Sequence, residues 1–173
     1  ALMGESSGAH LALLSGVTAS VNAMSNHEFG DDADQSEKVN AIIALYGPYE
    51  FDKFSDQFEE SGVIPKYPET GTAESFEGQM FKQQAPKDVP DKVEEYNPVT
   101  YFNPAMPPIL AFAGTADFVV PYQQTVNMIT AARKVVSDDR AEIHIVDGTG
   151  HGPDAYMTPE NTEIKADFLK KWL

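Results

Sequence analysis

The sequence predicts an α/β fold, in which a parallel sheet carries helices on both faces. Three runs support this prediction: VNAIIALY at residues 39–46, ILAFA at 109–113 and EIHIVD at 142–147. The first two are continuously apolar, which is typical of strands buried on both faces of a parallel sheet. The third partly alternates and is expected nearer an edge. Helical patterns separate the runs, and this alternation of strand and helix indicates a parallel α/β arrangement.

Residues 1–24 are expected to form the end of a buried strand, a tight turn and a helix. Apolar residues recur near the helical period in the helix. They are Leu11, Leu14, Val17 and Val21. Small side chains at Ala12, Gly16, Ala19 and Ala23 predict that this helix lies very close to the sheet. Residues 25–38 are acidic and contain Gly30, so they are interpreted as a polar loop.

Two further helices are predicted after the second apolar run. Residues 122–136 place Val126, Ile129, Ala132 and Val136 at helical spacing. A closing helix is expected to begin at Thr158 as N-cap, with Pro159 in its first position. Residues 49–105 have six prolines, many acids and no strong periodicity. This segment is interpreted as an insertion of short helices and loops within a single domain that spans residues 1–173.

Composition excludes several classes of protein. The 173 residues carry a net charge of −15, so binding to a phosphate backbone is disfavoured. The absence of cysteine excludes disulfides, thiolate zinc sites and a cysteine nucleophile. No apolar run approaches the roughly 18 residues that a membrane span requires. We therefore expect a soluble protein, cytoplasmic rather than secreted, with no nucleic-acid partner.

The strongest chemical motif is Gly4-Glu5-Ser6-Ser7-Gly8, which fits the G-x-S-x-G pattern of a nucleophile elbow. A strained strand-to-helix turn lifts the serine hydroxyl above the sheet. It also points the backbone N–H of Ser7 at a developing oxyanion, and the helix N-terminus adds favourable partial charge. The bare pattern is short, and the alternative is a Gly/Ser turn that packs a helix against a strand. The apolar strand before it and the small-residue helix after it favour the elbow.

A serine nucleophile requires a general base, and His151 has the most suitable setting of the four histidines. It lies in Gly148-Thr149-Gly150-His151-Gly152, a flexible loop after the third apolar run. His10 lies in the first helix and is expected to pack or cap locally. His27 lies in the acidic loop, and His144 lies within a strand.

The base requires an orienting acid, and Asp117 is the candidate. It follows the strand at 109–113, and the carboxyl ends of parallel strands are where such sheets place their sites. A turn-capping role for Asp117 and a competing role for Asp147 are the alternatives. The resulting order Ser6, Asp117, His151 is that of α/β-hydrolases.

The chain resembles the C-terminal part of an α/β-hydrolase of the esterase/lipase type. It is most similar to bacterial BD-FAE-like carboxylesterases, which are related to the hormone-sensitive-lipase group. The resemblance rests on GESSGAHLAL at 4–13, VNAIIALYGPYEF at 39–51, NPVTYF at 97–102, PPILAFAGTADFVVPYQQ at 107–124 and GTGHG at 148–152.

This resemblance implies a carboxylic-ester hydrolase with Ser6 as nucleophile, His151 as base and Asp117 as acid. It also implies the Ser7 N–H as one oxyanion donor. Segment 49–105 would correspond to a variable insert that shapes the acyl or alcohol pocket. A full member of the family has an N-terminal half with a further His-Gly-Gly-type loop, which this sequence lacks.

Substrate contacts are expected from Glu5, Tyr46 and Tyr49, with a small-molecule ester as substrate. Tyr46 and Tyr49 follow a strand on the same side as Ser6, although such aromatic residues are more often core. No cofactor or metal is implied. Asp32-x-Asp34-x-Ser36 has some likeness to a calcium loop, but Glu37 stands where glycine is needed, so a solvated acidic loop is favoured.

Two other functions remain open. A serine peptidase of the prolyl-oligopeptidase type shares the residue order, although Glu5 stands where those peptidases usually have tryptophan. The chain could also be an incomplete hydrolase that acts only as a scaffold, since loss of one oxyanion donor costs about 10²–10³ in rate.

The start of the sequence bears on possible partners. The chain begins at Ala1 rather than Met, which suggests the C-terminal part of a longer protein, or else a processed or trimmed chain with little missing. The first strand would then form a bare apolar edge. We expect it to pair with a second copy or with the missing N-terminal half.

Overall fold

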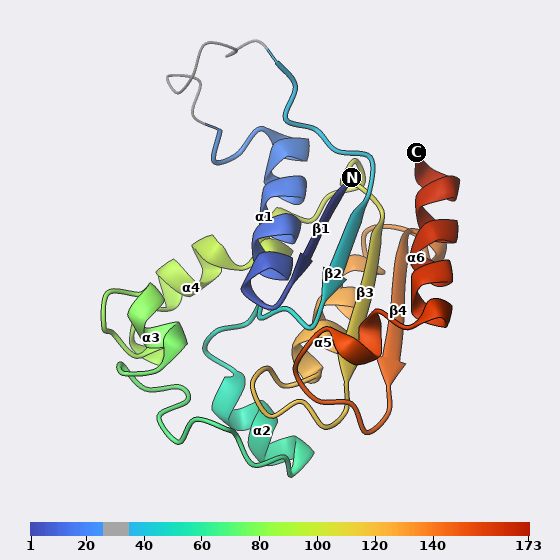
Figure 1. Ribbon diagram of the computed structural model, residues 1–173. Coiled ribbons are helices and arrows are strands. Elements are labelled where there is room, and N and C mark those ends of the chain that lie inside the picture. Colours follow the sequence, from blue (N-terminus) through green and yellow to red (C-terminus); the bar gives the residue numbers. More distant parts are fainter. Residues whose placement is uncertain (26–34) are drawn as a thin grey trace.

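Four parallel strands lie side by side in the order in which they occur along the chain (Figure 1). The computed structural model describes residues 1–25 and 35–173. Each strand pairs in register with the next, so that Gly4 lies beside Ala44 and Leu110 beside Glu142. The strands are β1 (Leu2–Glu5), β2 (Ile42–Leu45), β3 (Ile109–Gly114) and β4 (Ala141–Val146). All their carboxyl ends meet at one edge of the sheet.

Helices cover both faces of this sheet, which confirms the predicted fold class. One face packs against α1 (Ser7–Val21) and α5 (Gln123–Ala132) through a core that includes Leu13, Ile42, Ile109 and Met128. The opposite face packs against α6 (Pro159–Trp172) through Ile43, Leu110, Phe112 and Phe168. Neighbouring strand residues therefore face opposite cores, as the pleat of a strand requires.

The small residues of α1 allow the close approach that the sequence predicts. A Cβ at Gly16 would lie 2.5 Å from Cδ1 of Ile42 on β2, so at this position the helix backbone packs directly on the side chain of Ile42. The helix begins directly after β1, with Ser6 at its N-cap, and ends at Asn22 in the left-handed conformation. The strand, the turn and the helix thus form one rigid unit.

The two later helices agree with their predicted starts. The side chain of Thr158 caps α6 by accepting a hydrogen bond from the N–H of Asn161 at 3.2 Å, and Pro159 occupies the first turn. Helix α5 is shorter than the predicted 122–136. It ends at Ala132, after which the backbone N–H groups of Lys134 and Val135 bond to carbonyls only three residues earlier, those of Ala131 and Ala132, in a tighter turn.

Segment 49–105 connects β2 to β3 and contains only short helices. They are α2 (Phe54–Ser61), α3 (Phe76–Met80) and α4 (Pro90–Tyr96), with 3₁₀ turns at Pro86–Asp88 and Pro98–Tyr101. Its buried side chains form a small aromatic cluster with Val120 of the loop after β3. The cluster comprises Phe51, Phe54, Phe58, Phe81 and Val93. Through Val120 it anchors the segment beside the carboxyl ends of the strands.

The rest of the chain completes the sheet and its connections. Two 3₁₀ turns, Asp138–Arg140 and Asp154–Tyr156, lie before and after β4. Among the described residues, no helix is long and apolar enough to cross a membrane. His27, Asp32 and Asp34, which the sequence places in an acidic loop, lie outside the described residues.

Candidate active site

Ser6 occupies a strained turn between β1 and α1. Its backbone has φ 52° and ψ −124°, a conformation that non-glycine residues rarely adopt. A Cβ at Gly4 would overlap the carbonyl oxygen of Gly8, so the turn can form only with glycine at position 4. At Gly8 an added Cβ meets nothing within 4 Å of the described chain. The first glycine of the motif is thus required by packing within this chain and the second is not.

His151 lies between Ser6 and Asp117 and contacts both. Its Nε2 is 2.9 Å from Oγ of Ser6, and its Nδ1 is 2.8 Å from Oδ2 of Asp117. The side chain of Asp117 is 1 % exposed and that of His151 is 17 % exposed. The three predicted residues, which are 34 to 145 positions apart in sequence, therefore form one hydrogen-bonded chain.

The hydrogen-bond partners of Asp117 indicate which nitrogen of His151 carries the proton. Oδ1 of Asp117 accepts hydrogen bonds from the backbone N–H groups of Val119 and Val120 at 2.8 and 2.9 Å. An ionised carboxylate can only accept, so Nδ1 of His151 donates to Oδ2. Nε2 of the neutral imidazole then accepts from the hydroxyl of Ser6, which is the tautomer that a general base needs.

The loops that carry Asp117 and His151 are bonded to each other. The N–H of Ala116 donates to the carbonyl of Thr149 at 3.0 Å, and Oγ1 of Thr115 donates to Asp147 at 2.8 Å. A Cβ at Gly114 would overlap the Thr149 carbonyl, so this close approach requires glycine. These contacts fix Asp117 and His151 relative to each other before any ligand binds.

The remaining candidate acid and bases have other partners. Asp147 is exposed and accepts from Thr115, so Asp117 rather than Asp147 contacts His151. His144 stacks on Phe112 within the sheet, with ring centroids 5.0 Å apart. Nε2 of His10 donates to the carbonyl of Tyr96 at 2.8 Å, a partner 86 residues away rather than a local one. Burial lowers the pKa of His10 below 6.5, although its hydrogen bond to Tyr96 opposes the shift.

A cavity of about 590 Å³ opens beside Ser6 and His151. It is lined by both residues, by Ser7 and His10 of α1, and by the loops around α2, α3 and β3. Ser7 is the first residue of α1, so its backbone N–H is one of those that a helix leaves without a carbonyl partner. No acidic residue lies in the first turn of α1, which leaves the helix N-terminus favourable for negative charge. The other lining residues are Pro48, Phe51, Phe54, Lys66, Tyr67, Thr70, Phe76, Glu77, Met80, Phe118, Val119 and Val120.

Tyr46 and Glu5 contact each other, and Tyr46 also contacts His151. The Tyr46 hydroxyl donates to Oε2 of Glu5, and its ring packs edge-on against the imidazole of His151, with centroids 4.7 Å apart. Tyr46 also packs against Tyr156 and is only 2 % exposed. Burial and the bond to Glu5 raise the pKa of Tyr46. Neither Tyr46 nor Glu5 lines the cavity.

The structure corrects the expectation for Tyr49, which lies in the core instead of the cavity. It is fully buried among the residues that pack α1 and α5 onto the sheet, and its hydroxyl fills the space beside Gly47. Its backbone is held by Gln124 of α5, a fully buried residue whose Oε1 accepts from the N–H groups of Tyr49 and Glu50. Burial thus prevents direct contact between the Tyr49 side chain and a ligand in the cavity.

Two residues near the site have no clear signal in the sequence. Tyr156 is fully buried against Tyr46, and its carbonyl accepts from Nζ of Lys165 at 2.6 Å. Glu77 lines the cavity although it is almost fully buried. Both lie in segments without periodicity or motif, so only their positions in the folded chain distinguish them from neighbouring polar and aromatic residues.

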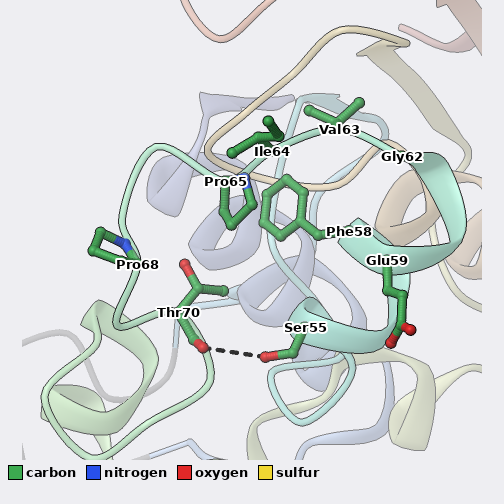
Figure 2. A pocket seen from close by; sticks show the side chains of 9 residues that line it. All are labelled: Ser55, Phe58, Glu59, Gly62, Val63, Ile64, Pro65, Pro68 and Thr70. Carbon is green, nitrogen blue, oxygen red and sulfur yellow. Dashed lines mark hydrogen bonds between the residues drawn. The ribbon is translucent and has the colours of Figure 1, made fainter.

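A second hollow of about 430 Å³ lies between α2 and the loop at 62–70. Figure 2 shows its lining, in which Oγ of Ser55 donates to the carbonyl of Thr70 at 3.1 Å. Thr70 lines both hollows, so they are neighbours. Glu59 is the ionisable side chain here, and no nucleophile–base pair is present, so this hollow lacks the chemistry found at Ser6. Elsewhere in residues 1–25 and 35–173, no group of three His, Asp or Glu is arranged to hold a metal ion.

Comparison with known proteins identifies the family. A family model described as BD-FAE matches residues 1–131. The chain belongs to the BD-FAE family. This membership confirms the resemblance inferred from the motifs at 4–13, 39–51 and 107–124.

Relatives of this BD-FAE chain are named as esterases. Esterase LipC of Mycobacterium tuberculosis (strain ATCC 25618 / H37Rv) is 26% identical over 156 residues, which cover 89% of this chain and 34% of LipC. A solved truncated form of a carbohydrate esterase from gut microbiota is 25% identical, with a TM-score of 0.76 over 98% of this chain and 58% of that one. The butyrate-bound esterase Est2 of Thermogutta terrifontis has a TM-score of 0.62 at 19% identity, covering 98% of this chain and 55% of its own. The BD-FAE chain thus spans about a third of LipC and just over half of these two solved chains.

Proposed function

We propose that this chain carries the nucleophile, base and acid of a serine carboxylic-ester hydrolase. The observation that carries the proposal is the hydrogen-bonded chain from Asp117 through His151 to Ser6, beside a cavity of about 590 Å³. Membership of a family whose relatives are named as esterases supports the same reaction class.

In the proposed first step, Oγ of Ser6 attacks the carbonyl carbon of the ester while its proton passes to Nε2 of His151. The imidazolium that forms is stabilised by the buried carboxylate of Asp117. Negative charge develops on the former carbonyl oxygen, where the N–H of Ser7 donates. The positive end of the α1 dipole favours that charge.

The intermediate then collapses to an acyl-enzyme. The bond from the carbonyl carbon to the leaving alkoxide oxygen breaks, and His151 returns its proton to that oxygen. A water molecule next donates a proton to His151 as it attacks the acyl carbon. The bond to Oγ of Ser6 breaks, Ser6 recovers the proton, and the carboxylic acid leaves.

Hydrolysis of p-nitrophenyl acetate tests this proposal. We expect turnover that disappears in Ser6→Ala and is kept in Ser15→Ala, a matched change at an exposed position on the same helix. A fluorophosphonate should also label Ser6 covalently, with the mass shift confined to the peptide that contains it. Labelling reports an activated serine even if turnover is slow. Absence of both turnover and label would contradict the proposal.

An ester–amide comparison separates this function from a serine peptidase. The acyl-enzyme route also cleaves amides, but a peptidase has to bind the peptide and protonate an amine leaving group. We expect p-nitrophenyl esters to be hydrolysed much faster than the matching p-nitroanilides. A p-nitroanilide of a proline peptide that is hydrolysed at least as fast as the ester would favour the peptidase.

We further propose that β1 pairs with another strand. Within the described chain β1 pairs only with β2, which leaves its other edge open. Met3 in β1 is 49 % exposed, and Leu11 on the adjacent helix α1 is 61 % exposed. An open strand edge together with exposed apolar side chains favours association with another strand. The added strand would come from a second copy or from the remainder of a longer protein. A monodisperse monomer by sedimentation velocity would exclude the second copy.

A further inference from the structure

Glu77 is a buried carboxyl for which the described chain supplies no hydrogen-bond donor. It is 6 % exposed, its Oε1 is buried without a partner, and no hydrogen bond or ion pair to either oxygen is found in residues 1–25 and 35–173. A buried polar group without a partner is costly, so such groups in native proteins call for an explanation. Glu77 lines the same cavity as Ser6 and His151, so a donor could reach it from within that cavity.

The surrounding structure holds Glu77 in place. The buried side chain of Ser75 caps the short helix α3 by accepting from the N–H of Gly78 at 3.0 Å. A Cβ at Gly78 would overlap the carbonyl of Thr72, so the preceding turn packs tightly on the helix. The ring of Phe76 meets that of Tyr67 edge-on, with centroids 4.9 Å apart. The position of Glu77 is therefore set before a ligand arrives.

The rest of the cavity shows what kind of ligand fits. Most of the side chains that line it are aromatic or aliphatic. Three of these side chains are exposed: Phe76 is 62 % exposed, Phe118 is 40 % exposed and Met80 is 40 % exposed. Exposed apolar side chains gathered around a cavity mark a ligand-binding surface. The ammonium of Lys66 lies at the same cavity, 5.3 Å from the ring centroid of Tyr67 and 5.9 Å from that of Phe118.

Glu77 and Lys66 together favour a ligand with a hydroxyl group over a ligand with a charged group. The Glu77 carboxylate only accepts hydrogen bonds and the Lys66 ammonium only donates them. A hydroxyl can donate to Glu77 and still accept from a donor. A ligand ammonium would satisfy Glu77 but meet the like charge of Lys66, and a ligand carboxylate would be repelled by Glu77.

We propose that Glu77 is a specificity-determining residue that accepts a hydrogen bond from a hydroxyl group of the ester substrate. The apolar walls formed by Phe76, Met80 and Phe118 hold the carbon skeleton next to that hydroxyl. This inference rests on the proposed function and narrows it to esters that carry a free hydroxyl on their acyl or alcohol part.

Three esters that differ by one hydroxyl test the inference. Ethyl butyrate is the reference, ethyl 3-hydroxybutyrate carries the hydroxyl on the acyl side, and 2-hydroxyethyl butyrate carries it on the alcohol side. We expect a higher kcat/KM for one hydroxylated ester, which identifies the side that faces Glu77. In Glu77→Gln this preference should fall about tenfold, because the neutral amide oxygen of glutamine is a weaker hydrogen-bond acceptor than a carboxylate.

Glu74→Gln is the matched control. It removes the same charge from an exposed residue three positions earlier, and Glu74 does not line the cavity. The melting temperature provides a second readout. Since Glu77 has no hydrogen-bond partner among the described residues, Glu77→Gln should melt no lower than the unsubstituted chain. A lower melting temperature together with an equal loss of rate on all three esters would assign Glu77 a purely structural role and overturn the inference.

Ligand binding separates failure of this inference from failure of the proposed function. Saturation-transfer NMR on Ser6→Ala, which cannot form an acyl-enzyme, measures binding of the three esters without turnover. Absence of both turnover and fluorophosphonate labelling in the unsubstituted chain would contradict the proposed function. Equal binding of all three esters, a preference as large in Ser6→Ala/Glu77→Gln as in Ser6→Ala, or tighter binding of ethyl 3-aminobutyrate than of the hydroxylated esters would overturn the role of Glu77.

Discussion

The ring of Tyr46 lies edge-on against the imidazole of His151, with centroids 4.7 Å apart and planes inclined by 69°. Tyr46 is held there by a hydrogen bond to Glu5, which directly precedes Ser6, and by Tyr156 on its other side. A contact of this kind restricts the imidazole to the plane in which it meets both Ser6 and Asp117. Glu5, the residue before Ser6, thus contacts His151 indirectly, through Tyr46.

The first prediction concerns this contact. Tyr46→Phe keeps the ring but loses the hydroxyl bond to Glu5, whereas Tyr46→Leu also loses the aromatic edge. An aromatic pair contributes about 0.5–1.5 kcal/mol, so Tyr46→Leu should reduce kcat for p-nitrophenyl acetate by up to about tenfold with little change in KM. Tyr46→Phe should lose less. A rise in KM with unchanged kcat would indicate direct contact with substrate and contradict a positioning role.

The second prediction compares two aspartates near His151. Asp117→Asn removes the carboxylate that accepts from Nδ1 of His151, and the amide favours the wrong imidazole tautomer. Loss of this kind costs about 10⁴ in kcat in serine hydrolases. Asp147→Asn is the matched control, because Asp147 is exposed and, among the described residues, accepts only from Thr115, so kcat should fall less than about fivefold. Equal losses in the two variants would contradict the assignment of Asp117.

The third prediction compares the two glycines of the elbow. Gly4→Ala would place a Cβ against the backbone carbonyl of Gly8, and neither backbone can move without unpairing β1 or α1. We expect this variant to lose more than about 4 kcal/mol of unfolding free energy or to fail to fold. Gly8→Ala meets no atom within 4 Å and should change stability by no more than about 1 kcal/mol. Urea titrations measure both values, and similar losses in the two variants would contradict the packing argument.

The fourth prediction is a pH dependence that arises from His10. Burial lowers the pKa of His10 in the folded chain below the 6.5 of the free side chain. Below pH 6.5 the unfolded chain therefore binds a proton that the folded chain does not, and stability falls as the pH falls toward the folded pKa. The effect is absent above pH 6.5, where both states are neutral.

His10→Gln isolates this contribution. Glutamine can still donate to the carbonyl of Tyr96 but does not titrate. The unfolding free energy of the unsubstituted chain minus that of His10→Gln should decrease from pH 7.5 to pH 5.0. A difference that stays constant over this range would show that His10 titrates alike in both states.

Much of the fold was predictable because its two central strands, β2 and β3, are buried on both faces, whereas β1 and β4 are partly exposed. A strand such as Ile109–Gly114 must be continuously apolar, and the residues after it must turn sharply, so Asp117 could be placed at the carboxyl edge of the sheet. The segment between β2 and β3 was not predictable in the same way. Its helices are short and pack on an aromatic cluster, so they leave no periodic pattern in the sequence.

The sequence by itself determined the fold class, the elbow at Ser6 and the order of the three candidate catalytic residues, because strand burial and turn geometry are local constraints on residue type. Only the tertiary structure showed that Asp117 rather than Asp147 contacts His151, placed Tyr49 in the core, set Tyr46 against His151 and left Glu77 buried without a donor among the described residues. These outcomes depend on which side chains meet across segments tens of residues apart. Contacts of this kind are decided by packing in the folded chain, so they cannot be predicted from composition or from residue spacing.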